Sequence, residues 1–278
     1  MADPGFDTVL RFVAGRGGGD AELCVTRTRD RRYEAREGRL DGIALADTVA
    51  LGLRVFRAGR MGFSYGFRGD AADLARMVEE AFFCADASDP DAAYGLPDAA
   101  GPATNLPLYD PSVETVAEGE KGEFARSLEA QALARDPRVK RVRTAALRET
   151  VATVCLFHSR GFAATRRASL CSAHVETVAE ENGEGQTGYG FGVARSLRGL
   201  NAAAIADEGA TRALRMLGAV RPKTGEYKVV LENGAAAELL EVLIPSFLSS
   251  QVAKGKSMFA GKVGGKVASG AVTIEDDP

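Results

Sequence analysis

Half of the prolines of this chain lie in one short segment. Five of the ten prolines occur between Asp89 and Pro111, among Ala, Gly, Asp and Asn residues and without apolar periodicity. Proline lacks the main-chain N–H and disfavours helix in the residue before it, so such a segment continues neither a helix nor a strand. We predict a surface linker over residues 89–111, with separate folding units on either side.

The segment before the linker combines short strands with one helix. Apolar residues alternate with Gly or Arg over residues 51–55, and a glycine-containing turn leads back into residues 61–67. This pattern predicts a β-hairpin in a small antiparallel sheet. Over residues 70–88 the apolar positions recur with helical spacing: Leu74, Met77, Val78, Ala81 and Phe82. We expect this helix to pack on one face of the sheet, which makes residues 1–88 an N-terminal α+β domain.

A second unit is predicted over residues 112–222. A helix is expected over residues 112–135, because the following Asp-Pro pair ends it. Strands follow over residues 139–191, with one alternating set of small and apolar residues: Cys171, Ala173, Val175, Thr177 and Ala179. A closing helix is expected over residues 201–217, with Asn201 as its N-cap. The pattern is that of a strand-rich, central α+β domain.

The third unit is predicted over residues 223–278. Residues 227–231 are a short apolar run typical of a strand, and Asn233 is placed to cap a following helix. Pro245 should end or kink that helix, and the glycine-rich tail becomes β-prone again at residues 271–274. A lone strand and helix bury little surface. We therefore expect these residues to begin a domain that the chain does not complete.

Composition and charge exclude several classes of protein. Apolar residues make up 45% and charged residues 26%, which is typical of a globular chain. The formal net charge of -3 gives no global attraction to nucleic acid or anionic membranes. The basic run at residues 27–39 is interleaved with Asp30, Glu34 and Glu37, which favours a solvated strand face over direct nucleic-acid binding. Without an apolar run of about 18 residues, we expect no membrane span and a cytoplasmic location with reduced cysteines.

Two Cys-x-x-His pairs are the candidate metal ligands. Cys155 with His158 and Cys171 with His174 supply the ligand types of a tetrahedral zinc site. Residues i and i+3 of a strand point to opposite faces, and the second pair continues as a strand, so chelation is disfavoured. We expect two buried cysteines and two partly exposed strand histidines. No metal ligand is assigned, and the four residues remain candidates only.

Catalytic motifs do not emerge from the residues. Neither histidine is followed by glutamate, as the helical zinc motif of metalloproteases requires, and no Gly-x-Ser-x-Gly elbow occurs. We therefore assign no catalytic residue and no cofactor-binding residue to this chain.

Several segments, taken in order, resemble one known family. They are residues 50–64 with the helix over 70–85, residues 159–181 with 185–189, and residues 224–230, 256–262 and 272–278. Together they are similar to the TldD/PmbA family, also called TldD/TldE. Its members were once named modulators of DNA gyrase and are regarded as zinc-dependent peptidases of peptide maturation and turnover.

The resemblance distinguishes two branches of the family. In TldD-like members a helix of the third unit carries a histidine-glutamate-x-x-x-histidine zinc motif. Here the helix over residues 235–244 reads Ala-Ala-Ala-Glu-Leu-Leu-Glu-Val-Leu-Ile, without histidine. The chain thus resembles the PmbA/TldE branch. This implies a non-catalytic subunit of a heterodimer that acts on extended peptides, with zinc in a TldD-like partner and none in this chain.

The resemblance leaves alternatives open. Family members continue past residue 278 into the remainder of a large β-rich C-terminal domain. The resemblance thus implies that this chain is truncated, and the surface so exposed could support self-association. One alternative is an autonomous hydrolase whose active-site residues lie in the missing part or in the Cys155, His158, Cys171 and His174 set. Another is a non-enzymatic modulator of DNA gyrase, as the old family name suggests.

Overall fold

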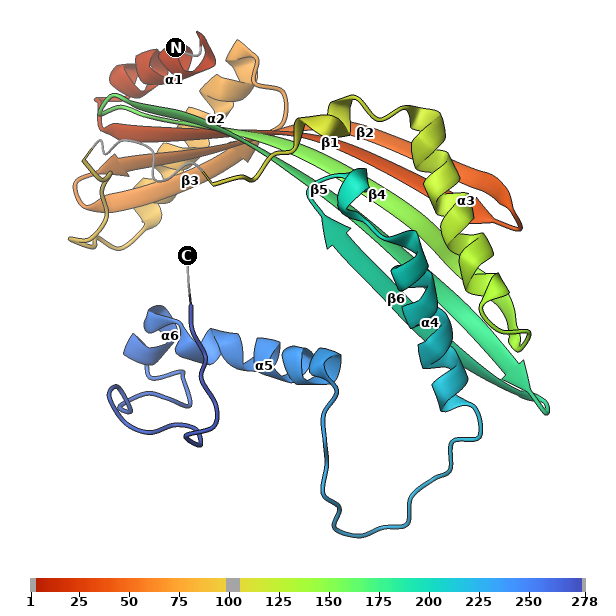
Figure 1. Cartoon of the computed structure of the whole chain (residues 1–278). Helices are drawn as coiled ribbons and strands as arrows, with labels where there is room; N and C mark the ends of the chain where they lie inside the picture. Colours follow the sequence, from red (N-terminus) through yellow and green to blue (C-terminus); the bar gives the residue numbers. More distant parts are fainter. Residues whose placement is uncertain (1–3, 99–105, 277–278) are drawn as a thin grey trace. The chain divides into compact units, whose positions relative to one another are not determined.

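The computed structural model describes residues 4–98 and 106–276, and Figure 1 shows its course. Residues 99–105 of the predicted linker, like the two chain ends, lie outside the described residues. The chain separates into two compact units, Met1–Ala219 and Val220–Pro278. None of the helices in the described ranges is long and apolar enough to cross a membrane.

A single antiparallel sheet organises the first unit. In the described residues it has six strands in the order β3-β2-β1-β4-β5-β6, long and curved in Figure 1. The strands are β1 Asp20–Arg36, β2 Arg39–Arg57, β3 Arg60–Gly66, β4 Val139–His158, β5 Phe162–Glu181 and β6 Glu184–Ala194. β1 pairs with β4 from Glu22 opposite His158 to Ala35 opposite Ala145. The sheet is therefore continuous across the two domains expected from the sequence, whose boundaries remain a prediction.

Helices cover one face of this sheet at both ends of its long strands. The helices are α1 Pro4–Gly15, α2 Ala71–Ala87, α3 Glu118–Ala134 and α4 Ala202–Met216, with short 3-10 helices η1 Pro111–Glu114 and η2 Leu197–Gly199. Figure 1 places α1 and α2 at one end and α3 and α4 at the other. On β1, Leu23 and Val25 belong to the first core and Tyr33 to the second. Side chains two residues apart along a strand point to the same face, and these three positions are separated by even numbers of residues. Both cores therefore lie on the same side of the sheet. The predicted α+β class is confirmed.

The first core confirms the predicted amphipathic helix. The expected apolar stripe of α2 packs against β3, β2 and α1 and is buried in one cluster with Leu53 and Phe157. The helix begins after Asp70, whose side chain accepts the N–H of Asp73 at 2.9 Å. This is an ordinary N-cap, and burial of the stripe supplies most of the stability of the helix.

The two edge strands carry glycine where a helix crosses them. A Cβ on Gly62 of β3 would lie 1.8 Å from the carbonyl oxygen of Ala81 in α2. A Cβ on Gly190 of β6 would lie 2.0 Å from the carbonyl oxygen of Ile205 in α4. Only glycine allows these helices to approach so closely.

Two features of the first unit differ from the sequence-based expectation. The helix predicted over residues 112–135 is broken, because η1 ends at Glu114 and α3 begins at Glu118. The main chain is extended at Ala117, with φ -66° and ψ 146°, and this residue interrupts the helical path before α3. The helix α1 was not predicted, although the spacing of Phe6, Val9 and Val13, all buried, indicates one.

In the described residues, the regular elements of the second unit are helices, and the rest of its chain is irregular. It contains α5 Asn233–Phe247 and α6 Ser249–Ala253. The strand predicted over residues 227–231 is wrong: the main chain there is irregular and Val230 is 95% exposed. Isolated strands are not stable, and no described segment of this unit pairs with it. Asn233 is the first helical residue and not the cap, and the helix ends shortly after Pro245.

Candidate functional site

The strand register keeps the candidate zinc ligands apart. Cys171 lies opposite Glu149, which is six residues along β4 from Cys155, a separation of about 20 Å. His158 lies opposite Phe162 at the far end of the same pair of strands. Among the described residues, no group of three His, Cys, Asp or Glu side chains could hold a metal ion. As the described structure places them, Cys155, His158, Cys171 and His174 do not fit a shared zinc ion.

The two histidines instead make local contacts. His158 is 3% exposed and not partly exposed as predicted; its ring stacks on Phe162 at 5.1 Å between centroids. His174 is half-buried and stacks on Tyr189 at 5.8 Å. Burial, with a smaller effect of the Arg32 charge, lowers the pKa of His174, so this ring is neutral at pH 7.

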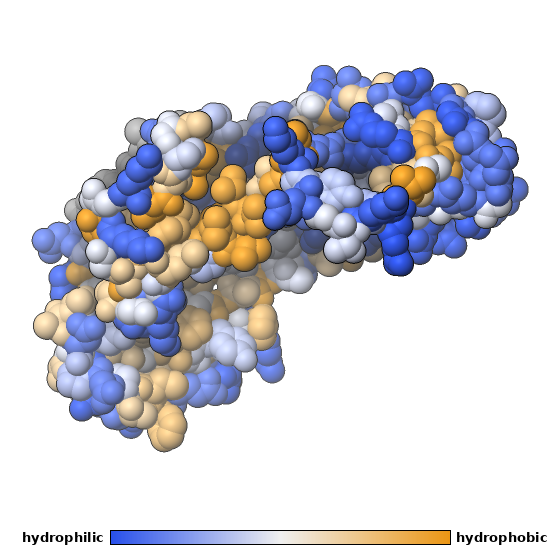
Figure 2. Space-filling view, turned by 90° about the horizontal axis from the view of Figure 1, so that it is seen from below, coloured by the Kyte–Doolittle hydropathy of each residue, from blue (hydrophilic) through white to orange (hydrophobic). Residues whose placement is uncertain are grey.

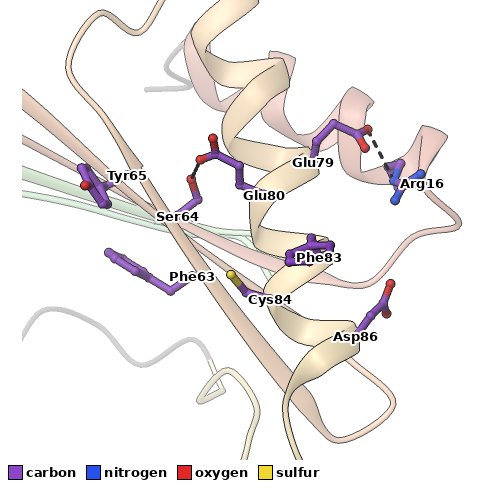
Figure 3. A pocket seen from close by; sticks show the side chains of 9 residues that line it. All are labelled: Arg16, Phe63, Ser64, Tyr65, Glu79, Glu80, Phe83, Cys84 and Asp86. Carbon is purple, nitrogen blue, oxygen red and sulfur yellow. Dashed lines mark hydrogen bonds and ion pairs between the residues drawn. The ribbon is translucent and has the colours of Figure 1, made fainter.

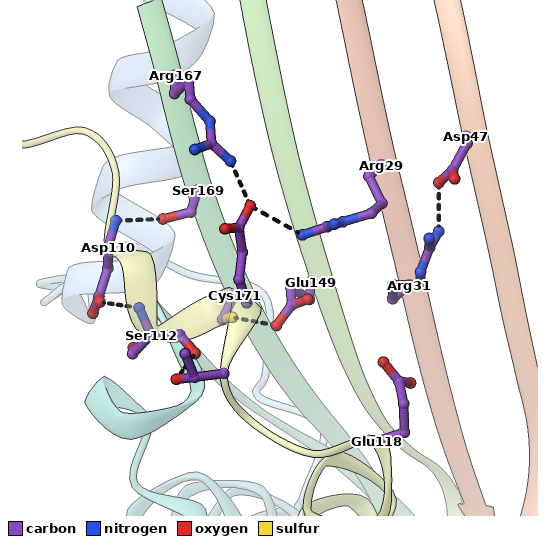
Figure 4. A network of polar contacts seen from close by, with 12 residues as sticks. Arg29, Arg31, Asp47, Asp110, Ser112, Glu118, Glu149, Arg167, Ser169 and Cys171 are labelled. Atoms are coloured by element: carbon purple, nitrogen blue, oxygen red, sulfur yellow. Dashed lines mark hydrogen bonds and ion pairs between the residues drawn. The ribbon is translucent and has the colours of Figure 1, made fainter.

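A belt of charged residues separates the two apolar cores on the helix-bearing face. It joins the strands to the segment that follows the linker, and Figure 4 shows these contacts. Glu114 of η1 meets Arg167 of β5 at 2.5 Å and Arg29 of β1 at 3.7 Å. Ser169 of β5 accepts the main-chain N–H of Asp110 at 3.0 Å. We call these contacts, together with those of α3 described next, the polar belt.

The deepest part of the polar belt is an ion pair. Lys121 Nζ of α3 lies 3.0 Å from Glu149 Oε1 of β4 and 3.5 Å from Glu118 Oε1. The hydroxyl of Tyr33 donates to Glu118, which lowers the pKa of that carboxyl. Burial, and then this hydrogen bond, raises the pKa of Tyr33. Burial, and then the charge of Glu149, raises the pKa of Cys171 to about 12. The thiol is therefore protonated at neutral pH and is neither a nucleophile nor a metal ligand.

The polar belt anchors the end of the linker and the segment after it to the sheet. Glu114 and Glu149 are paired with Arg or Lys, and the main-chain N–H of Asp110 is held by Ser169. Sequence reasoning assigned the basic run at residues 27–39 to a solvated face, which is wrong for Arg29 and Arg31, both half-buried. Both lie an even number of residues from Val25 and Tyr33 on the same strand. This spacing is the sequence signal that places them on the helix-bearing face.

An open groove runs between β3 and the outer flank of α2, with a volume of about 610 Å³. The aromatic rings of Phe63, Tyr65 and Phe83, about half to three-quarters exposed, make its apolar part. Its polar lining is Arg16, Ser64, Glu79, Glu80, Cys84 and Asp86. In Figure 3, Phe63 and Tyr65 point away from α2, whereas Ser64 points toward Glu80, which accepts its hydroxyl at 2.7 Å.

The main chain of β3 has one unpaired edge along this groove. The β2–β3 turn has positive φ at Ala58 and Gly59, which defines a two-residue hairpin in which Arg57 and Arg60 are hydrogen-bonded. Along an antiparallel pair, hydrogen-bonded and non-hydrogen-bonded residue pairs alternate. Residues 61, 63 and 65 are therefore in non-hydrogen-bonded pairs and direct their N–H and C=O groups away from β2. Arg76 of α2 donates to the Tyr65 carbonyl oxygen at 3.2 Å. The described residues provide no partner for the main chain of Met61 or Phe63 at this edge.

The opposite edge strand, β6, is more fully capped. Its hairpin turn at Asn182 and Gly183 also has positive φ, so Tyr189 and Phe191 direct their main-chain groups outward. Arg212 of α4 donates to the Tyr189 carbonyl oxygen, and Glu208 accepts the Phe191 N–H, each at 3.2 Å. Helix side chains thus block the middle of β6, whereas the middle of β3 is open. Figure 2 shows that apolar side chains reach the surface in patches between hydrophilic ones.

Comparison with known proteins assigns the class to which this architecture belongs. Three family models of PmbA/TldA metallopeptidases match this chain. The model of domain 1 matches residues 21–85, that of the central domain residues 110–217, and that of the C-terminal domain residues 224–278. The chain belongs to this metallopeptidase family. The suspected TldD/PmbA resemblance is confirmed. Among curated proteins, it is 25% identical over 279 residues to the metalloprotease PmbA of Escherichia coli O157:H7, covering 98% of this chain.

Solved structures share the fold at low sequence identity. A modulator of DNA gyrase from Thermotoga maritima has a TM-score of 0.81, with 20% identity over 93% of this chain. A second, from Bacteroides thetaiotaomicron, has a TM-score of 0.82, with 20% identity over 95%. TldE from Thermococcus kodakarensis has a TM-score of 0.76, with 17% identity over 93%. The chain spans 60% of the length of the E. coli protein and 58%, 61% and 58% of these structures.

Proposed function

We propose that this chain is a PmbA/TldE-like subunit of a cytoplasmic, zinc-dependent metallopeptidase and that a TldD-like subunit is its catalytic partner. Membership of the metallopeptidase family supports the reaction class. The observation that carries the assignment of the branch is the helix over residues 235–244, which contains no histidine. Both histidines of the chain lie on β4 and β5, where the register separates them.

In this proposal the two subunits have different roles, catalysis in the partner and peptide binding in this chain. Zinc, where the partner holds it, supplies a Lewis acid for peptide hydrolysis. This chain contributes peptide positioning: an extended peptide adds main-chain hydrogen bonds along a strand edge, and side-chain pockets select its sequence. The ion pairs of the polar belt agree with this division, because they hold η1 and α3 against the sheet.

Co-expression with a zinc-bearing TldD-like homologue tests the proposal. We expect the two chains to co-purify, the pair to cleave an unstructured peptide, and the 278-residue chain alone to contain no stoichiometric zinc by elemental analysis. Cleavage by this chain alone, surviving removal of any trace partner, would overturn it. Zinc near one per chain that is lost in Cys171→Ser or His174→Ala would instead support the autonomous hydrolase.

A further inference from the structure

One row of side chains crosses the sheet between the apolar clusters and belongs to none of them. Arg27 of β1 lies opposite Thr153 of β4, and Thr153 lies opposite Arg167 of β5. On the two flanking rows, Val25 belongs to the first core and Val151 to a separate small cluster. Each member of the row lies an even number of residues from a buried position of its own strand, so all three side chains are on the helix-bearing face. Arg27 and Arg167 are exposed there.

The positive charge of this row is only partly compensated. Arg167 and Arg29 share one carboxylate, that of Glu114, and the contact with Arg29 is long at 3.7 Å. Asp47 lies opposite Arg29 but is already paired with another arginine at 2.7 Å. Arg27 has no ion-pair or hydrogen-bond partner among the described residues. An unpaired guanidinium beside two that share one carboxylate leaves an excess of positive charge on this part of the face.

Glu114 shows which ligand fits between arginines of these strands. Its carboxylate bridges Arg29 and Arg167, although β4 lies between their strands. Adjacent strands are about 4.8 Å apart, so Arg27 and Arg167, in one row, are about 10 Å apart at Cα. Arg29 lies two residues from that row and is therefore farther from Arg167. Because one carboxylate bridges the longer separation, a second can bridge the shorter one above Thr153.

The donors needed for a second carboxylate are present. A guanidinium has five N–H groups in a planar fork, so Arg167 can hold Glu114 with some and a ligand with others. Arg27 has all of its donors available within the described structure. The hydroxyl of Thr153, midway between them, has no hydrogen-bond partner among the described residues and can donate as well.

We propose that Arg27 and Arg167, with Thr153 between them, bind a carboxylate of an acidic peptide. Hydrogen bonds from two guanidiniums to one carboxylate are charge-assisted and are stronger than neutral ones. The carboxylate belongs either to an acidic side chain or to the C-terminus of the peptide, because the chemistry that is recognised is the same. The inference rests on the proposed function in one respect, that the ligand is a peptide.

Fluorescence anisotropy with the 278-residue chain tests this site directly. The probe is a rhodamine-labelled peptide of alternating glutamate and serine with an amidated C-terminus. Two further peptides have glutamine in place of glutamate, one amidated and one with a free C-terminal carboxylate. We expect the amidated glutamine peptide to bind at least tenfold more weakly than the better of the two carboxylate peptides. Which of those binds more tightly distinguishes a side chain from a C-terminus. Equal affinity for all three would overturn the site.

Substitution of Arg27 identifies the residues that bind. Arg27→Gln should weaken binding of the better carboxylate peptide about tenfold, because a charge-assisted contact is lost. The matched control Arg32→Gln lies on the same strand but on the opposite face, and should leave the affinity unchanged. Glu114→Gln should tighten binding severalfold, since it releases two guanidiniums from a competing carboxylate. Equal effects of the two arginine variants, or weaker binding by Glu114→Gln, would contradict the proposal.

Arginine footprinting on the unsubstituted chain keeps the test decisive if a variant does not fold. The peptide should protect Arg27 and Arg167 from phenylglyoxal, measured by mass spectrometry, and leave Arg32 reactive. Equal protection of all three would overturn the site. A single-stranded DNA oligonucleotide serves as a phosphate competitor. If it displaces the peptide at equal concentration and itself binds more weakly to Arg27→Gln, the ligand is a phosphate and the carboxylate assignment is wrong.

These outcomes separate this inference from the proposed function. Arg27-dependent binding of the peptide by this chain, without cleavage by any pair, would retain the site and reject the metallopeptidase subunit. Cleavage by the pair that is equal for the glutamate and glutamine peptides and unaffected by Arg27→Gln would retain the function and reject the site.

Discussion

Lys121 and Glu149 form an ion pair in which both side chains are almost completely buried, at 4% and 3% exposure and 3.0 Å between Nζ and Oε1. The pair joins α3 to β4 between the two apolar cores of the sheet. Removing one member leaves an uncompensated charge in a medium of low dielectric constant, which costs far more than the intact pair contributes. The pair therefore makes the packing of α3 specific.

We expect Lys121→Met to lower the free energy of unfolding by about 3–5 kcal/mol, measured by urea denaturation. The double variant Lys121→Met with Glu149→Leu should recover most of that loss, because neither charge remains. Arg126→Met on the same helix is the control: its pair with Glu123 is exposed and should cost less than about 1 kcal/mol. A Lys121→Met cost as small as that of the control would show that water reaches the pair.

Gly190→Ala should destabilise the protein by about 3 kcal/mol, because its Cβ would lie 2.0 Å from the Ile205 carbonyl oxygen. The helix must move away from β6 to accommodate a methyl group. Gly185→Ala, on the same strand, meets only Glu180 at 3.7 Å and serves as the matched control. Thermal unfolding should separate the two variants clearly. Similar melting temperatures would mean that α4 adjusts without cost.

Local patterns of the sequence predicted the elements whose packing is local. The stripe of α2 and the alternation around Cys171 and Val175 appear as buried faces, because burial of one face imposes the period of the element. The turn at residues 57–60 was also predictable, since a glycine was available for positive φ.

Long-range pairing was not predictable from the same patterns. Glu22 lies opposite His158 although more than a hundred residues separate them, and no local signal in β1 specifies β4 as its neighbour. The polar belt was missed for the same reason, because Glu114 meets Arg29 and Arg167 only after that pairing forms. The strand expected over residues 227–231 failed because propensity alone does not supply a pairing partner.

Asp73 should make stability depend on acidic pH. Hydrogen bonds from Arg76, and then from the main-chain N–H groups of Gly69 and Arg68, lower the pKa of its carboxyl from 3.8 to about 2. The folded state therefore favours the ionised form. Its contribution is fully present above pH 3.8 and is lost as the pH falls from 3.8 toward about 2.

The variant Asp73→Asn isolates this contribution. It should melt a few degrees below the parent protein at pH 7, and the difference should shrink as the pH falls toward 2. Asp7→Asn in the first turn of α1 provides a reference carboxylate for scanning calorimetry across the same pH series. A constant difference between parent and Asp73→Asn would show that the carboxylate charge is not what stabilises the start of α2.

Cysteine reactivity should follow burial and the pKa of the thiol. Cys84 is exposed on α2, whereas Cys171 is fully buried and its pKa is raised to about 12. At pH 8 the thiolate fraction of Cys171 is about one in ten thousand, so iodoacetamide should modify Cys84 rapidly and Cys171 only in urea. Peptide mapping by mass spectrometry measures both sites in one sample. Lys121→Met provides a further check, because loosening α3 should speed modification of Cys171 without changing Cys84. Equal rates at the two cysteines in the native protein would contradict the packing of η1 and α3 over β5.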